Sequence, residues 1–326
     1  MKAFKLYFTL SMALTISYAS AQLCNQDNRF SDAELFSNTQ IDSITNIKYG
    51  AAINQQGVAQ DLFIDFYFPN NSIDTMAKRP FILLIHGGGF KRGSKEGHTA
   101  SLCKEFAKRG FVAATMSYRL GFDQTVSGDI AIAVYRAQQD ANTALRYTAK
   151  NADELKIDTS WIFIGGSSAG AITSLYTTYG SQEEWNQIFP ALESELGPLD
   201  SSGNNLEQTF TIKAIFNNYG AASPRVLSPG EKLIPMISFH GELDKVVPID
   251  KSSKTGFGSR ALHNILNEQG VCNDLTVDPT GGHGVYYSEV GVKYGVGRAA
   301  CFFKSLFCDT CSSFFSTETI SASCSN

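Results

Sequence analysis

The chain has few basic residues and, after its N-terminus, no long apolar run. Its 326 residues include 27 Lys and Arg against 31 Asp and Glu, without a basic cluster. Nucleic acids and anionic membrane surfaces are therefore not expected partners. A membrane-spanning helix needs ~18 uninterrupted apolar residues, and no segment after residue 21 reaches that length. The composition favours one large globular domain without a membrane span.

The first 21 residues have the features of a cleavable export signal. Lys2 and Lys5 precede an apolar stretch over 6–16, and residues 19–21 (Ala-Ser-Ala) fit the small-residue cleavage rule. We expect cleavage after Ala21 and a secreted or periplasmic protein. Its 25 remaining Lys and Arg against 31 Asp and Glu give a net charge of about −6.

Cysteine is not scarce, and all of it lies after the export signal. The seven residues are Cys24, Cys103, Cys272, Cys301, Cys308, Cys311 and Cys324. In an exported protein, disulfides are the expected state of such residues. The four after residue 300 could in principle hold zinc, but no histidine joins them and the compartment favours oxidation. The odd number leaves one free thiol or an intermolecular bond, and the spacing does not fix the pairing.

Strand-like and helix-like segments alternate, which predicts an α/β fold with a mostly parallel central sheet and helices on both faces. Residues 62–68 alternate apolar and polar side chains, as an outer antiparallel strand does. Continuous apolar runs predict buried strands at 81–85, 111–116, 161–164, 214–216 and 236–239. Helices are expected at 130–149, 169–179, 257–269 and 284–306.

Residues 22–308 are expected to form one domain with a small insertion at 180–211. The insertion mixes aromatic and leucine side chains with many polar residues, which predicts a cap or lid over the carboxyl edge of the sheet. A disordered surface loop is the alternative. Residues 309–326 are rich in Ser, Thr and Cys and are predicted to be a peripheral tail.

The most informative motif lies at residues 161–170, Trp-Ile-Phe-Ile-Gly-Gly-Ser-Ser-Ala-Gly. Four apolar residues run into G-x-S-x-G, with Ser168 at its centre. This pattern is typical of a nucleophile elbow, in which a buried strand turns sharply into a helix and exposes a hydroxyl. Gly166 and Gly170 provide the space that such a turn needs. Because the motif also occurs by chance in glycine-rich turns, other parts of the chain must show whether Ser168 is catalytic.

A second motif precedes the first by about 80 residues. Residues 82–90 form an apolar strand that ends in His86-Gly87-Gly88-Gly89-Phe90, which leaves backbone amides accessible. Such amides can stabilise an oxyanion. A phosphate-binding loop is excluded because no Gly-Lys-Ser/Thr follows. HGGG followed by G-x-S-x-G is much more specific than either motif alone.

Together these motifs resemble the α/β-hydrolase superfamily, in particular its carboxylesterase and hormone-sensitive-lipase-like branch. The matching segments are residues 86–90 (HGGGF), 117–120 (SYRL), 166–170 (GSSAG), 240–244 (HGELD) and 282–284 (GHG), and the resemblance covers roughly residues 45–306. Residues 111–120 and the export signal are also similar to secreted bacterial acetyl and feruloyl esterases of plant polysaccharides. The resemblance implies that residues 22–308 are a serine esterase domain.

The resemblance also implies roles for individual residues. Ser168 is expected to be the nucleophile, and the amides of Gly88, Gly89 and Ala169 are expected to form the oxyanion hole. His86 is expected to order the glycine loop and to take no part in the chemistry.

The acid of the triad should follow the serine and precede the histidine. Asp244 lies just after the apolar strand segment, and Val-Val-Pro follows it as in the resembling enzymes. Asp244 is therefore the expected acid. Glu242 is its main rival, and Asp250 and Asp278 are weaker ones.

Only His263 and His283, of five histidines, follow the acid. His263 falls within a predicted helix, whereas His283 lies in a glycine-rich loop that lets its ring reach the sheet edge. We expect His283 to be the general base. Because free histidine titrates near ~6.5, activity is expected to fall on acidification through that region.

Four aromatic residues beside these motifs, Phe90, Phe122, Tyr219 and Tyr286, are candidates for an acyl or alcohol pocket. No metal or cofactor is expected. The short insertion favours short acyl groups, and the export signal together with the resemblance favours acetyl or feruloyl esters linked to carbohydrate. Lipid or polyester hydrolysis and a non-catalytic binding module on the same fold are the alternatives. The sequence does not predict the oligomeric state.

Overall fold

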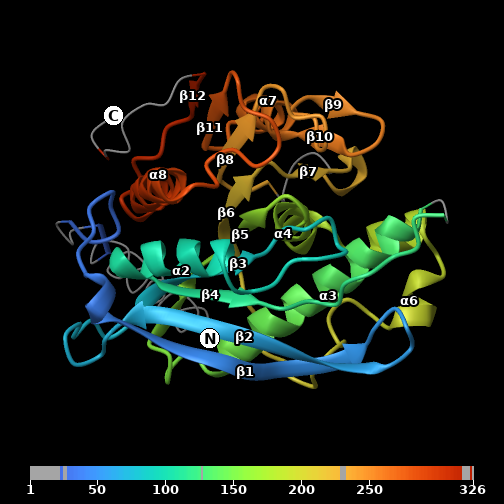
Figure 1. The fold of residues 1–326 in the computed structure, drawn as a ribbon, viewed down its shortest axis with the longest axis horizontal. Helices are drawn as coiled ribbons and strands as arrows, with labels where there is room; N and C mark the ends of the chain where they lie inside the picture. The colour runs from blue at the N-terminus through green and yellow to red at the C-terminus, as the bar shows by residue number, and fades with distance from the viewer. Residues whose placement is uncertain (1–22, 25–27, 126–127, 228–232, 318–323, 325–326) are drawn as a thin grey trace, which may run out of the picture.

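A nine-stranded sheet forms the centre of the computed structural model, which describes residues 23–24, 28–125, 128–227, 233–317 and 324. The strand order is β1-β2-β4-β3-β5-β6-β8-β11-β12 (Figure 1). The bounds are β1 Ile41–Ile53, β2 Ala59–Pro69, β3 Arg79–Ile85, β4 Val112–Met116, β5 Ile157–Ser167, β6 Ile212–Asn218, β8 Met236–Gly241, β11 Asn273–Asp278 and β12 Phe314–Ser316. Strands β1, β2 and β4 pair antiparallel, and the remaining pairs are parallel.

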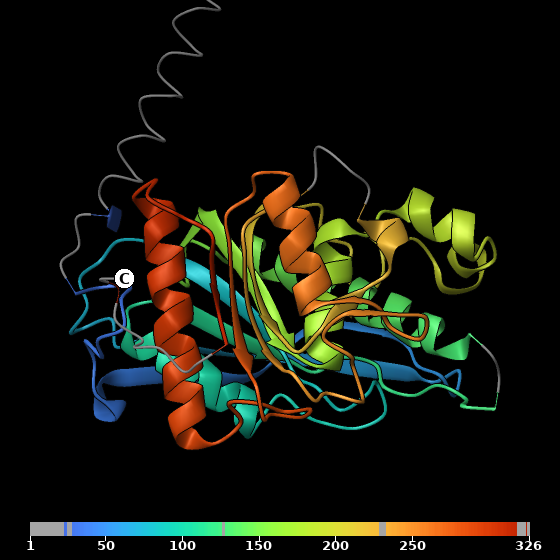
Figure 2. The same cartoon turned by 90° about the horizontal axis from the view of Figure 1, so that it is seen from above.

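Helices cover both faces of this sheet. They are α2 His98–Lys108, α3 Asp129–Lys150, α4 Ala169–Tyr179, α7 Ser259–Glu268 and α8 Glu289–Phe307. Figure 2 shows α8 (red) and α7 (orange) on opposite sides of the sheet. The central strands are apolar throughout because both of their faces are buried. The predicted α/β fold, with its mostly parallel sheet and flanking helices, is confirmed.

The side chains of β3 illustrate the two cores that this layering creates. Phe81, Leu83 and Ile85 pack in the core beneath α3 and α4. Ile82 and Leu84 point to the opposite face and pack with residues of α2 and α8. Every residue of β3 is buried, as the continuous apolar run predicts.

Several elements differ from the sequence-based expectations. Strand β1 was not predicted, because most of its side chains are exposed and it lacks an apolar alternation. Helix α2 and strand β11 were also not predicted, and α8 begins at Glu289 and not at residue 284. Within the expected peripheral tail, β12 pairs with β11 and forms the edge of the sheet.

The insertion at 180–211 contains α5 (Gln182–Ile188) and α6 (Leu192–Leu196). Trp185 of α5 is buried, and its indole Nε1 donates a hydrogen bond of 2.7 Å to Gln138 of α3. Its ring also packs edge-on against Tyr135. The insertion is thus helical and is packed against α3.

Smaller elements complete the fold. They are the 3-10 helices η1 (Asn38–Gln40) and η2 (Pro224–Val226) and a three-stranded sheet of β7 (Ala221–Ala222), β10 (Gly256–Gly258) and β9 (Lys251–Ser252). Within the described residues, no helix is both long enough and apolar enough to cross a bilayer. The predicted export signal lies outside the described residues.

Three disulfides anchor the two ends of the domain. They join Cys24 to Cys308, Cys272 to Cys311 and Cys301 to Cys324. Cys103, on α2, is the free cysteine and is buried. The pairing that the spacing left open therefore attaches both the N-terminal segment and the tail to α8 and β11.

Candidate active site

Ser168 occupies a strained turn between β5 and α4. Its backbone has φ +55° and ψ −119°, a conformation that is costly for a residue with a side chain. The turn requires close packing, since a Cβ at Gly166 would lie 2.3 Å from the carbonyl oxygen of Ile85, and one at Gly170 only 2.0 Å from it. This local geometry is that of the nucleophile elbow expected from G-x-S-x-G.

The loop after β11 places His283 opposite Ser168. Ser168 Oγ lies 2.8 Å from His283 Nε2, and His283 Nδ1 lies 2.7 Å from Asp244 Oδ2. An ionised carboxylate only accepts hydrogen bonds, so Nδ1 donates to Asp244 and Nε2 of the neutral ring accepts from the Ser168 hydroxyl. The structure thus brings together three residues that lie far apart in the sequence, each after a different strand.

Asp244 lies on the loop after β8 and is held by four groups. Its Oδ1 accepts the amides of Val246 and Val247 at 2.8 and 2.9 Å. His240 Nε2 lies 3.3 Å from Oδ2, the oxygen that faces His283. Burial by itself would raise the pKa of Asp244, but the hydrogen bonds from His240, His283 and Val247 outweigh it and lower the pKa well below its usual value. The carboxylate therefore stays ionised at neutral pH.

The other candidate acids and the other candidate histidine interact with residues outside the Ser168–His283–Asp244 arrangement. Glu242 and Asp250 both pair with Arg260. Asp278 accepts hydrogen bonds from the amide and hydroxyl of Thr280 in the loop before His283. His263 Nε2 lies 3.0 Å from Asn267 Nδ2 on α7.

The glycine loop after β3 lies along the same cavity. Gly88 and Gly89 both line it, and within the described residues neither amide donates to a protein acceptor. Ala169 is the first residue of α4, where a helix leaves its amide without an intrahelical acceptor. His86 stacks on Tyr118, with ring centroids 4.4 Å apart, and lies beside the loop. This packing fits the expected role of His86 in ordering the loop.

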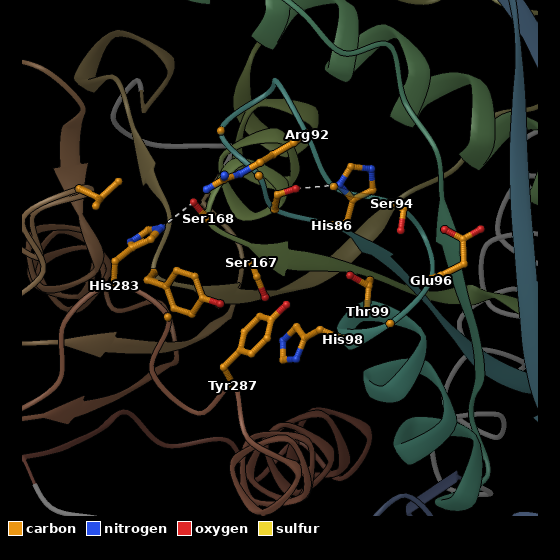
Figure 3. Close-up of a pocket in the computed structure, with 18 residues that line it drawn as sticks. His86, Arg92, Ser94, Glu96, His98, Thr99, Ser167, Ser168, His283 and Tyr287 are labelled. Carbon is orange, nitrogen blue, oxygen red and sulfur yellow. Dashed lines mark hydrogen bonds between the residues drawn. The ribbon is translucent and has the colours of Figure 1, made fainter.

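A cavity of about 630 Å³ opens beside Ser168 and His283 (Figure 3). Its wall is supplied by the glycine loop, the start of α2 and the loop after β11, and polar side chains reach into it although more of its surface is apolar than polar. The lining includes Arg92, Ser94, Glu96, His98, Thr99, Ser167, Tyr219 and Tyr287. His98 and Tyr287 stack with ring centroids 3.9 Å apart and close one side.

The four candidate pocket aromatics occupy different places. Tyr219 lines this cavity and packs edge-on against His283 at 4.9 Å. Phe90 lines a second, apolar cavity of about 440 Å³ between α3, α4 and the insertion. Phe122 lies beneath the Lys91 ammonium, and Tyr286 packs against Phe239 and Tyr294.

Sequence reasoning missed several residues of the site. Arg92, Glu96 and His98 follow the HGGG motif within ten residues. Their closeness to that motif in the sequence could have identified them as candidates for the cavity wall. Tyr287 is the neighbour of the chosen Tyr286, and the face of each ring could not be assigned before the start of α8 was known. His240 was read only as the end of a strand, although it lies four residues before Asp244.

The described residues offer one cluster with metal-ligand atoms, Asp32 with Cys301 and Cys324. Both cysteines belong to a disulfide, so they have no thiolate to donate to a metal.

Comparison with known proteins gives partial sequence matches to esterases. The chain is 35% identical over 96 residues to gut esterase 1 of Caenorhabditis elegans, which is 29% of this chain and 17% of that protein. It is 29% identical over 182 residues to juvenile hormone esterase of Heliothis virescens, 54% of this chain and 30% of that protein. The matched part spans less than a third of the length of these curated relatives.

Solved structures resemble the whole domain. An esterase of Thermogutta terrifontis with bound propionate superposes with a TM-score of 0.58 at 21% identity, covering 82% of this chain and 95% of that one. Esterase B of Lactobacillus rhamnosis gives a TM-score of 0.56 at 14% identity, covering 94% and 98%. At such identities the likeness establishes the shared α/β-hydrolase fold.

The sequence profile of one family matches a region that begins within β2 and ends shortly after η2. This is the BD-FAE family, and the match spans residues 64–228, just over half of the 326 residues. The matched region includes both the glycine loop and the elbow, which carried the resemblance to hormone-sensitive-lipase-like esterases. The chain belongs to the BD-FAE family.

Proposed function

We propose that this protein is an exported serine hydrolase of carboxylic esters that works through an acyl-enzyme. The observation that carries the proposal is the chain of two short contacts, Ser168 Oγ to His283 Nε2 at 2.8 Å and His283 Nδ1 to Asp244 Oδ2 at 2.7 Å. A serine hydroxyl is a weak nucleophile until a base accepts its proton, and this arrangement supplies the base.

The residues would share the reaction as follows. Ser168 Oγ attacks the ester carbonyl while His283 Nε2 takes its proton, and Asp244 holds the imidazole and stabilises the imidazolium. The amides of Gly88, Gly89 and Ala169 stabilise the oxyanion. His283 then protonates the leaving alcohol. Water attacks the acyl-Ser168 ester with His283 again as base, and the carboxylic acid is released.

The substrate class is proposed from the cavity and from export. Polar side chains in the cavity lining, among them Ser94, Glu96 and Thr99, could form hydrogen bonds with the hydroxyl groups of a carbohydrate, whereas a lipid chain has no such groups. Acetyl or feruloyl esters linked to carbohydrate are therefore the favoured substrates, and such substrates lie outside the cell. Three disulfides are consistent with an exported protein. The apolar cavity lined by Phe90 keeps lipid and polyester substrates as the second candidate.

The deciding experiment compares wild type with Ser168→Ala on 4-nitrophenyl acetate and butyrate. Loss of the nucleophile should lower kcat by about 10⁴-fold or more, with little change in the thermal midpoint. Ser174→Ala is a matched control, since Ser174 lies on α4 and its hydroxyl donates to the carbonyl of Gly170. Equal hydrolysis by wild type and Ser168→Ala would remove the enzymatic function and favour a binding module.

A further inference from the structure

Arg92 lines the catalytic cavity next to the glycine loop. Its amide donates a hydrogen bond of 3.2 Å to the carbonyl of Gly88, which fixes its backbone beside that loop. Figure 3 shows its side chain running along the cavity wall, with the guanidinium directed toward Ser168. A permanent positive charge therefore lies at the reacting end of the cavity.

The guanidinium of Arg92 has no protein partner among the described residues. The acid nearest to it in the cavity wall is Glu96, which lies away from Ser168, beside Thr99 at the start of α2 (Figure 3). Glu96 is paired with Lys95 Nζ at 2.9 Å, and hydrogen bonds from Lys95 and Ser94 lower its pKa to about 2. Lys95 in turn also pairs with the buried Asp65. The charge at Arg92 is thus not neutralised by its surroundings.

The other basic side chains near Ser168 do not supply a positive charge to the cavity. Burial lowers the pKa of His98 to about 4, so His98 is neutral at physiological pH. Lys91 is adjacent in sequence, but its ammonium lies 4.6 Å above the ring of Phe122 and outside the cavity lining. Among the described residues that line the cavity, Arg92 is therefore the cation that a substrate can reach.

We propose that Arg92 selects esters that carry a carboxylate close to the scissile bond, on either the acid or the alcohol part. The forked donors of a guanidinium match a carboxylate, and such charged hydrogen bonds are stronger than neutral ones. The contact requires no chemical step beyond ester hydrolysis. The inference rests on the proposed function, because it assigns a substrate property to the same site.

The test uses pairs of esters that differ in charge. For the acid part, mono-4-nitrophenyl glutarate is compared with 4-nitrophenyl valerate, and for the alcohol part, 4-acetoxybenzoate is compared with its methyl ester. Arg92→Gln keeps a polar side chain without the charge and should lower kcat/KM for the anionic ester of at least one pair by about tenfold. The loss should lie mostly in KM, and the neutral esters should change by less than about twofold. The arm that responds identifies which part carries the carboxylate.

Two variants and a salt series control the test. Arg92→Lys should recover part of the preference, and about 1 M salt should reduce the preference of wild type. Lys91→Gln removes the same charge one residue away and should leave the ratio of anionic to neutral substrate unchanged. Equal loss for both members of each pair in Arg92→Gln, or an equal effect of Lys91→Gln, would overturn the assignment while Ser168-dependent hydrolysis remained.

Binding without turnover separates this inference from the proposed function. In Ser168→Ala protein, calorimetry compares monomethyl glutarate with dimethyl glutarate and 4-acetoxybenzoate with its methyl ester. In at least one pair the anionic compound should bind more tightly, and Arg92→Gln should abolish the difference. Equal binding within both pairs, or no binding of any of the four compounds, would contradict anion recognition. Failure of wild type to hydrolyse any ester would instead contradict the proposed function and leave the calorimetric result to decide the role of Arg92.

Discussion

Both carboxylate oxygens of Asp244 are held by hydrogen bonds, so a substitution there tests how the His283 ring is oriented. Two amides hold Oδ1, while His283 and His240 face Oδ2. His240 is itself fixed, with Nε2 2.8 Å from the carbonyl of Val247 and Nδ1 2.7 Å from Ser259 Oγ. The orientation of the His283 ring is therefore set by a network that is buried except at the ring itself.

Asp244→Asn should lower kcat by about 10⁴-fold, because an amide nitrogen facing His283 favours the wrong tautomer of the imidazole. The loss should appear at neutral pH, where the low pKa of Asp244 keeps the native carboxylate ionised. Asp250→Asn is the matched control, since Asp250 pairs with Arg260 on the surface. Steady-state kinetics of both variants test whether Asp244 is the acid that orients His283. Retention of more than about a tenth of the activity in Asp244→Asn would contradict this role.

At the residue scale, the sequence predicted which residues meet but not the contacts around them. Ser168, Asp244 and His283 could be selected because each has a distinctive local pattern and a required order along the chain. Arg92 and Tyr287 could not be assigned to the cavity, because the direction of an exposed loop side chain depends on neighbours that the sequence does not place. Tyr286 and Tyr287 are adjacent, yet only the latter lines the cavity.

At the scale of elements, the elbow depends on how closely α4 crosses β3. A Cβ at Gly170 would lie 2.0 Å from the carbonyl oxygen of Ile85 and 2.8 Å from that of His86, and neither is a flexible side-chain atom. The strand that carries the glycine loop and the helix that follows the nucleophile are therefore in direct backbone contact. This contact couples the proposed oxyanion donors to the proposed nucleophile.

Gly170→Ala should lower the free energy of unfolding by about 2–3 kcal/mol or more, because the strand and the helix must separate. Gly295→Ala, on α8, offers a control in which the new Cβ meets no atom within 4 Å. There the substitution should be neutral or stabilise the helix by up to about 1 kcal/mol. Urea unfolding of both variants tests the prediction, and a similar stability for the two would contradict it.

Elements buried on both faces were the easiest to predict. Strands β3 and β5 and helix α4 combine strong apolar patterns with flanking glycines, and α4 was predicted with its observed bounds. Strand β1 lies at the edge of the sheet with most side chains exposed, so its register depends on pairing with β2. Strand β12 is only three residues long and lies near the Cys272–Cys311 disulfide, a constraint that spacing alone could not reveal.

At the scale of the whole molecule, the disulfides connect segments that the sheet alone would leave loosely held. The Cys24–Cys308 bond joins residues 284 positions apart, and the other two attach the tail to β11 and α8. Cross-links of this kind stabilise a protein mainly by restricting its unfolded chain. The fold should therefore lose stability in a reducing environment.

The disulfide pattern makes a direct prediction about thiol reactivity. Cys103 is buried, and burial raises the pKa of its thiol well above the usual value, so the native protein should react with no thiol reagent at neutral pH. After unfolding without a reductant, one thiol per chain should react, whereas prior reduction should release all seven and lower the thermal midpoint. Two or more reactive thiols in the unreduced, unfolded protein would contradict the assigned pairing.

The central claim is that Ser168 is the nucleophile of an ester hydrolase, and covalent labelling tests it most directly. Wild-type protein treated with a fluorophosphonate should gain one adduct, which peptide mass spectrometry should locate on Ser168, and ester hydrolysis should cease in proportion. Ser168→Ala should gain none under the same conditions. An adduct on another residue, with activity lost to the same extent, would contradict the account.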